Sequence, residues 1–118
     1  MRTSIFALAA TLLAATAQAA DRKLPSKFLG HWCSVINNSN ESAGATYRRG
    51  RCRDPDSDGR MTVNVNGFRG WEEDCQVLSV TPASNGKYQA KFKCDGEGST
   101  WTTNHRMSLD NKGQLIMK

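Results

Sequence analysis

The sequence predicts an all-β protein, a small antiparallel β-barrel or closed sandwich of about six to eight strands with two disulfides. Beyond residue 19, short runs alternate apolar with polar side chains, and turn-forming residues separate the runs. All four cysteines fall in this part of the chain. A domain of this size buries a limited core, so disulfides are expected to supplement it.

Residues 1–19 have the pattern of a cleavable signal peptide. Arg2 supplies a positive charge, residues 5–17 are mostly apolar and uncharged, and a small-x-small pattern ends at Ala19. The apolar run is shorter than the roughly 20 residues of a spanning helix, so a membrane span is not expected. The mature protein is therefore predicted to be periplasmic or secreted, with an N-terminal arm at residues 20–27 and a single β domain at residues 28–118.

Strands are expected where the alternation is clearest, and turns where Asn, Ser, Gly, Pro and Asp gather. Residues 37–45, which carry two N-x-S sequons, predict a loop, and residues 54–59 predict a turn. Asn66-Gly67 and Arg69-Gly70 are expected to break the chain after the third strand. The expected strands are residues 28–35, 47–53, 60–65, 75–81, 87–94, 101–109 and 114–117.

The cysteine spacing indicates disulfides rather than a metal site, because no C-x-x-C occurs and the two histidines are far apart in the sequence. Three connectivities are open. A hairpin turning at residues 83–86 would place the last two cysteines directly opposite, or diagonally in an alternative register, on one face in both cases. This favours Cys33–Cys52 with Cys75–Cys94.

One segment resembles the opening of a calcium loop. Asp54, Asp56 and Asp58 alternate ahead of Gly59, but Val65 stands where a bidentate Glu is required and no helices flank the segment. The two interpretations are a weak calcium site at these three aspartates and an Asp-rich turn without metal. No other cofactor is expected.

Charge is clustered along the chain, whose net charge is +5. Four arginines, at 48, 49, 51 and 53, fall within six positions, and acidic residues gather at 72–74 and at 95 and 97. The candidate binding residues are Arg48, Arg49, Arg51 and Trp71, for an anionic or a protein partner. A nucleic-acid partner is not expected, since such a module carries more basic excess with interleaved aromatics. Solubility and local pairing are the simpler interpretation of the charges.

Catalytic groups are few. Glu72 and Glu97 would face each other if the hairpin register continued past the cysteines, and paired carboxylates serve glycoside hydrolysis. No other nucleophile, base or metal set accompanies them, and His105 is expected to be a core or rim residue. The chain is therefore not expected to be an enzyme.

Gly30-His31-Trp32 resembles the G-x-W start of lipocalin-like β-barrels, in which the tryptophan plugs one end of the barrel. The layout is similar to that of small exported bacterial barrels that inhibit secreted metalloproteases or lysozyme, although the cysteine pattern of the metalloprotease inhibitors is simpler. In those inhibitors the arm ahead of the barrel enters the enzyme's cleft, which here would be residues 20–27.

The resemblance implies an exported, non-enzymatic binding protein, with inhibition of an extracellular or envelope hydrolase as its sharpest version. The alternatives are a periplasmic small-ligand or weak calcium-binding protein and an envelope structural or stress component. The oligomeric state is left open.

Overall fold

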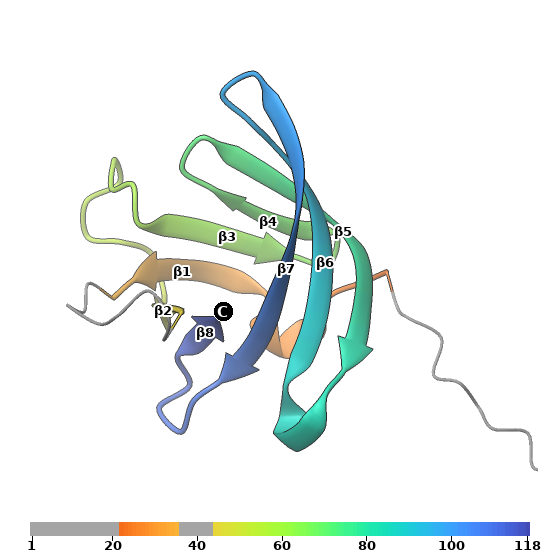
Figure 1. Ribbon diagram of the computed structural model, residues 1–118. Helices are drawn as coiled ribbons and strands as arrows, with labels where there is room; N and C mark the ends of the chain where they lie inside the picture. Colours follow the sequence, from red (N-terminus) through yellow and green to blue (C-terminus); the bar gives the residue numbers. More distant parts are fainter. Residues whose placement is uncertain (1–21, 36–43) are drawn as a thin grey trace, which may run out of the picture.

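The protein folds as a closed eight-stranded antiparallel barrel in the computed structural model, which describes residues 22–35 and 44–118 (Figure 1). The all-β class, barrel closure and both disulfides are thereby confirmed. The predicted signal peptide and the two sequons lie outside the described residues. Around the barrel the order is β1-β2-β8-β7-β6-β5-β4-β3. The elements are η1 (Ser26–Phe28), β1 (Gly30–Ser34), β2 (Ala45–Arg49), β3 (Arg60–Asn64), β4 (Gly67–Gly70), β5 (Glu73–Pro82), η3 (Ser84–Gly86), β6 (Tyr88–Gly96), β7 (Ser99–Leu109) and β8 (Leu115–Met117).

Strand β4 was expected to be a break in the chain, and that prediction is wrong. It pairs with β3 on one side and β5 on the other. Its first residue, Gly67, has φ 154°, and an added Cβ would lie 1.8 Å from the carbonyl oxygen of Cys75. The glycine therefore marks a close approach of two paired strands rather than their end.

The β5–β6 hairpin fixes the second disulfide. Cys75 lies directly opposite Cys94, as one of the two predicted registers requires, and Val77 and Phe92 share their buried face. The register then shifts by one residue between Val77 and Ser79. This bulge turns Leu78 outward, where it is 39% exposed. The turn occupies three residues, 84–86, closed by Ala83 N–H donating to the Lys87 carbonyl at 2.8 Å.

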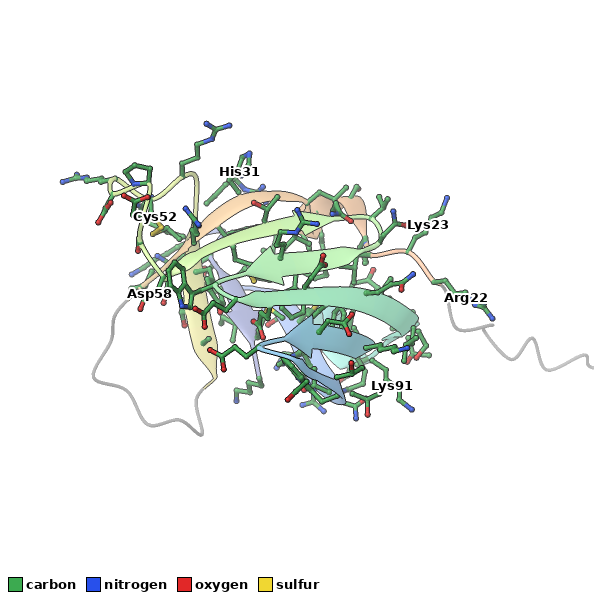
Figure 2. The ribbon with its side chains drawn as sticks, turned by 90° about the horizontal axis from the view of Figure 1, so that it is seen from above. Arg22, Lys23, His31, Cys52, Asp58 and Lys91 are labelled. Atoms are coloured by element: carbon green, nitrogen blue, oxygen red, sulfur yellow. A yellow bond between two sulfur atoms is a disulfide. The ribbon has the colours of Figure 1, made fainter. Side chains whose placement is uncertain are left out.

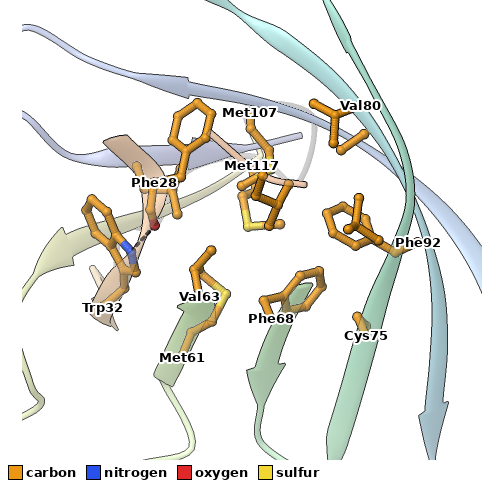
Figure 3. Close-up of a cluster of buried hydrophobic side chains, with 14 of the residues drawn as sticks. Phe28, Trp32, Met61, Val63, Phe68, Cys75, Val80, Phe92, Met107 and Met117 are labelled. Carbon is orange, nitrogen blue, oxygen red and sulfur yellow. Dashed lines mark hydrogen bonds between the residues drawn. The ribbon is translucent and has the colours of Figure 1, made fainter. Parts of the chain in front are cut away.

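Apolar side chains fill the barrel interior (Figure 3). Phe92 and Phe68 meet edge to face, with ring centroids 4.9 Å apart, at the centre of the cluster. The other buried members are one residue ahead of η1, one in η1 and residues of six strands, which unites the barrel in one core: Leu24, Phe28, Trp32, Met61, Val63, Cys75, Val77, Val80, Ala90, Cys94, Met107, Leu115 and Met117.

One end of the barrel is sealed around Trp32, which is 1% exposed. Its indole Nε1 donates to the Phe28 carbonyl at 2.9 Å, the bond drawn dashed in Figure 3. The guanidinium of Arg49 stacks on the ring at 4.3 Å and donates to the carbonyls of Leu29 (3.0 Å) and Lys27 (2.9 Å). The indole N–H of Trp32 and both terminal nitrogens of Arg49 are thus paired, which favours a rigid closure. We call this the sealed end.

The predicted arm is partly built into the sealed end. Leu24 is 3% exposed, and its N–H donates to the Val65 carbonyl at 2.9 Å. Residues 26–28 then form η1, with Phe28 fully buried. From Leu24 onward, the segment predicted as an arm contributes to the core through Leu24 and Phe28.

Among the described residues no helix has the length and apolar character needed to cross a membrane. Two disulfides in a small domain are compatible with an extracellular or periplasmic protein.

Candidate functional site

Two hairpins end side by side at the end of the barrel opposite the sealed end. The β4–β5 turn has Trp71 and Glu72 at its centre, and the β6–β7 turn has Glu97 and Gly98. Because β5 pairs with β6, the two turns are neighbours (Figure 1). A hollow of about 340 Å³ lies between them. We call this region the hairpin-tip surface; its residues are Trp71, Glu72, Glu73, Gly96, Glu97, Ser99 and Trp101.

The tips adopt backbone conformations that are unusual for their residues. Glu72 and Glu97 have φ values of 54° and 49°, in the left-handed region that costs non-glycine residues about 1–2 kcal/mol. At the sealed end the turn of the β5–β6 hairpin uses Asn85-Gly86 for nearly the same φ pair, 59° and 69°, as Glu97-Gly98, 49° and 78°. Asn is a residue that tolerates this region, whereas Glu is not. The glutamates are therefore held in place despite their backbone preference.

A glycine lets the two tips approach. A Cβ added to Gly96 would lie 2.3 Å from the Glu72 carbonyl oxygen and 3.1 Å from Cη2 of Trp101. Only a residue without a side chain fits between this carbonyl and the indole ring. Gly96 thus sets the distance between the turns and the position of Trp101 over them.

The tips are acidic and their charges interact. Hydrogen bonding with Glu97, then the like charge of that group, then slight desolvation raise the pKa of Glu72. Glu73 also affects Tyr47 of β2. Burial is the larger cause that raises the pKa of Tyr47, and the negative charge of Glu73 raises it further. In the described part of the chain the only salt bridge joins Arg69 to Asp74, at 3.0 Å. The three glutamates of the tips therefore carry negative charge with no described cation paired to them.

Two tryptophans stand in this acidic setting. Trp71 is 49% exposed and Trp101 is 38% exposed, and both line the same hollow. A tryptophan combines a large apolar surface with an N–H donor, and exposed apolar groups that gather in one place are typical of binding sites. The arrangement offers an apolar anchor with a negative rim.

The structure separates the four residues predicted to bind a partner. Trp71 belongs to the hairpin-tip surface, whereas Arg49 stacks on Trp32 and donates to two backbone carbonyls at the sealed end. Both terminal nitrogens of Arg48 face the Arg51 carbonyl at 3.4 Å, which braces the following loop. Arg51 lines a different pocket on the side of the barrel.

The calcium ligand set is not assembled. Asp54 Oδ1 accepts the backbone N–H of Asp56 at 3.0 Å, which is the hydrogen bond of an Asx turn. Within residues 22–35 and 44–118 no three His, Cys, Asp or Glu side chains come close enough to hold a metal ion. In this structure the segment Asp54–Asp58 forms an Asp-rich turn.

Glu72 and Glu97, the pair that the extended register predicts to face each other, lie close enough for Glu97 to raise the pKa of Glu72. His105 lies on the inner face of β7 against Phe68 and Phe92, with centroids 5.9 and 5.8 Å away. Burial lowers its pKa, and its Nδ1 has no hydrogen-bond partner in the described part of the chain.

No known protein family, curated protein or solved structure matches this chain. The site therefore rests on geometry alone. Sequence reasoning found Trp71 and the facing glutamates separately, and missed Trp101 as their neighbour. A signal was available in the sequence. Both turns, at residues 70–72 and 96–98, begin with glycine and contain a glutamate, and they flank the two strands of one hairpin.

Proposed function

We propose that this is an exported, non-enzymatic binding protein whose hairpin-tip surface docks on a basic patch of a partner protein. Inhibition of an extracellular or envelope hydrolase is its sharpest version. The observation that carries the proposal is the placement of two exposed tryptophans, Trp71 and Trp101, on one hollow rimmed by glutamates. Aromatic anchors of this kind dominate the energy of protein interfaces.

Charge favours a basic partner. The chain as a whole is positive, at +5, whereas the described tips carry Glu72, Glu73 and Glu97. A negative patch on a positive protein orients the encounter with a basic surface and disfavours approach by other faces. The glutamates then supply specificity, and the indoles supply most of the affinity.

The turns also lower the cost of binding. Each tip has two central residues between directly paired strands, Gly70 opposite Glu73 and Gly96 opposite Ser99. Little conformational freedom remains to be lost when a partner docks, so more of the contact energy appears as affinity. Strained non-glycine residues held by the surrounding fold are typical of ligand clamps.

The hairpin tips replace the arm as the proposed inhibitory element. Leu24 and Phe28 are buried in the core at the sealed end, so moving this segment into an enzyme's cleft would remove both side chains from the barrel. The layout similarity to small exported inhibitors still supports inhibition, through loops rather than the arm. The small-ligand carrier is less supported, because core side chains occupy the barrel interior (Figure 3).

The test is binding and inhibition with the mature, oxidised protein against purified secreted metalloproteases and lysozymes. For an enzyme that is bound, Trp71→Ala and Trp101→Ala should each weaken binding about 30-fold, the effect of removing an interface anchor of about 2 kcal/mol. Leu78→Ala is the matched control. Leu78 is about as exposed as Trp101, at 39% against 38%, but it lies on the bulge of β5, away from the hairpin tips. It should leave affinity unchanged.

Charge gives a second readout. Glu72→Gln with Glu97→Gln should slow association and flatten its dependence on salt, because screening acts on exposed charges. Absence of binding across the panel at micromolar concentration would overturn the hydrolase version. Binding that is indifferent to both tryptophans would overturn the assignment of the surface.

A further inference from the structure

A second hollow lies on the side of the barrel, between the segment 51–60 and the outer face of β1 and β3. Its volume is about 290 Å³. His31 and Thr62, which are paired across β1 and β3, form its floor, and Arg51, Cys52, Pro55 and Arg60 form its walls. Figure 2 shows His31 and Cys52 on the same side of the molecule, away from Arg22 and Lys23. We call this hollow the loop pocket.

The loop pocket is pinned at several points. The Cys33–Cys52 disulfide ties the start of the loop to β1, with Cα atoms 5.1 Å apart. At its end, Ser34 N–H donates to the Gly59 carbonyl at 2.8 Å, and the Arg60 guanidinium donates to the Pro55 carbonyl. The walls are thus held in position, which favours a pocket that exists before a ligand arrives.

Cationic groups dominate the polar lining. Arg60 uses one nitrogen on the Pro55 carbonyl, which leaves further N–H donors of its planar fork available. Within residues 22–35 and 44–118 the Arg51 side chain makes no hydrogen bond or salt bridge, while its carbonyl is braced by Arg48. Two guanidinium groups with a neighbouring third make this the basic counterpart of the acidic hairpin-tip surface.

A single carboxylate, that of Asp54, shares the lining. Its Oδ1 accepts the Asp56 N–H, but its charge still opposes an incoming anion. Arg51 and Arg60 together outweigh Asp54 by one positive charge, so the pocket attracts an anion. A carboxylate also matches the bidentate geometry of a guanidinium.

We infer that the loop pocket binds a small carboxylate that carries an apolar body. The carboxylate pairs with Arg51 and Arg60, and the apolar body lies against the Cys52 disulfide and the Pro55 ring. This site is independent of the hairpin-tip surface and of the function proposed for it. Because the pocket is shallow and its arginines are exposed, the expected dissociation constant is on the order of millimolar.

The test is an NMR titration of the mature, oxidised protein with sodium benzoate, followed through backbone amide shifts. Benzoate should move the amides of residues 31, 52, 60 and 62, and benzamide, its neutral isostere, should not. No saturable shift, equal shifts with benzamide or shifts confined to other strands would each overturn the inference.

Three substitutions in one loop sharpen the test. Arg51→Gln removes an unpaired guanidinium and should weaken benzoate binding about tenfold. Arg53→Gln removes the same charge from the same loop outside the pocket lining and is the matched control. Asp54→Asn keeps the acceptor of the Asx turn while removing the repulsion, so it should strengthen binding about threefold. Equal effects of Arg51→Gln and Arg53→Gln would show diffuse charge attraction instead of a site.

Discussion

Replacing Glu97 by Asn should make the protein more stable while weakening the binding of a partner to its hairpin-tip surface. Glu97 holds φ 49° in a turn whose other central residue, Gly98, has φ 78°, which is the φ pattern of a type I′ turn. The left-handed region costs an ordinary residue about 1–2 kcal/mol, and Asn avoids much of this. The expected gain in the free energy of unfolding is about 1 kcal/mol, or a rise in Tm of about 4–8 °C for a domain near 100 residues.

The assay is urea and thermal unfolding of the mature oxidised protein at neutral pH. Asn85→Glu is the reciprocal control, because Asn85-Gly86 has nearly the same φ pair in the turn at the sealed end. Asn85→Glu should lower the free energy of unfolding by about as much as Glu97→Asn raises it. If Glu97→Asn left stability unchanged or lowered it, or if Asn85→Glu had no cost, the argument from backbone strain would be refuted. A gain in stability with a loss of partner binding is the expected signature of a functional position.

The same pair predicts a pH dependence. Hydrogen bonding with Glu97 and its like charge raise the pKa of Glu72 above its ordinary value of 4.5. The folded protein therefore holds this proton more tightly than the unfolded chain, so the contribution is present at low pH and is lost as pH rises through the folded pKa. Relative to Glu97→Asn, the wild-type protein should lose Tm as the pH rises above about 4.5. A constant difference over this range would contradict the coupling.

Two further predictions concern the sealed end. Arg49→Met should lower the free energy of unfolding in urea by about 2–3 kcal/mol, since it removes the stack on Trp32 and two hydrogen bonds to backbone carbonyls, and an unchanged midpoint would refute the plug. Removing the mature N-terminus through Leu24 should cost about 2 kcal/mol, the burial of one leucine, whereas removal through Lys23 should be far milder. Equal stability of the two truncations, measured by Tm, would show that Leu24 does not anchor the segment.

The alternation of side chains predicted much of this barrel because each strand has one buried face. The apolar residues Val77 and Phe92 indicate which face of the hairpin is buried. Cys75 and Cys94 lie on the same face, which favours a disulfide between them. With Cys75–Cys94 assigned, Cys33–Cys52 followed by elimination. Period-two patterning is a local signal, and the disulfides depend on little else.

What the sequence did not predict depends on contacts between distant segments. The short strand β4 begins and ends with glycine, so its pairing is visible only beside β3 and β5. Leu24 is a lone apolar residue between Lys23 and Pro25, and nothing local shows that it is buried. Among clustered arginines, only the pairing of β1 with β2 selects Arg49 as the one that stacks on Trp32.

The candidate site divides in the same way. The hairpin register predicted from the sequence already placed Glu72 and Glu97 close together. The joining of Trp71 and Trp101 needed the close approach that Gly96 permits, which depends on the path of two separate turns.

The two disulfides determine what a single proteolytic cut would do to the chain. A single peptide-bond cut between Cys33 and Cys52, or between Cys75 and Cys94, leaves the two fragments covalently joined. The central bonds of the hairpin tips, at residues 71–72 and 97–98, lie outside both of these segments. A cut there would separate the chain into two unlinked fragments. The resistance of the tips to cleavage therefore depends on their shape, because a two-residue turn cannot adopt the extended conformation of a cleaved substrate without unpairing the strands that flank it.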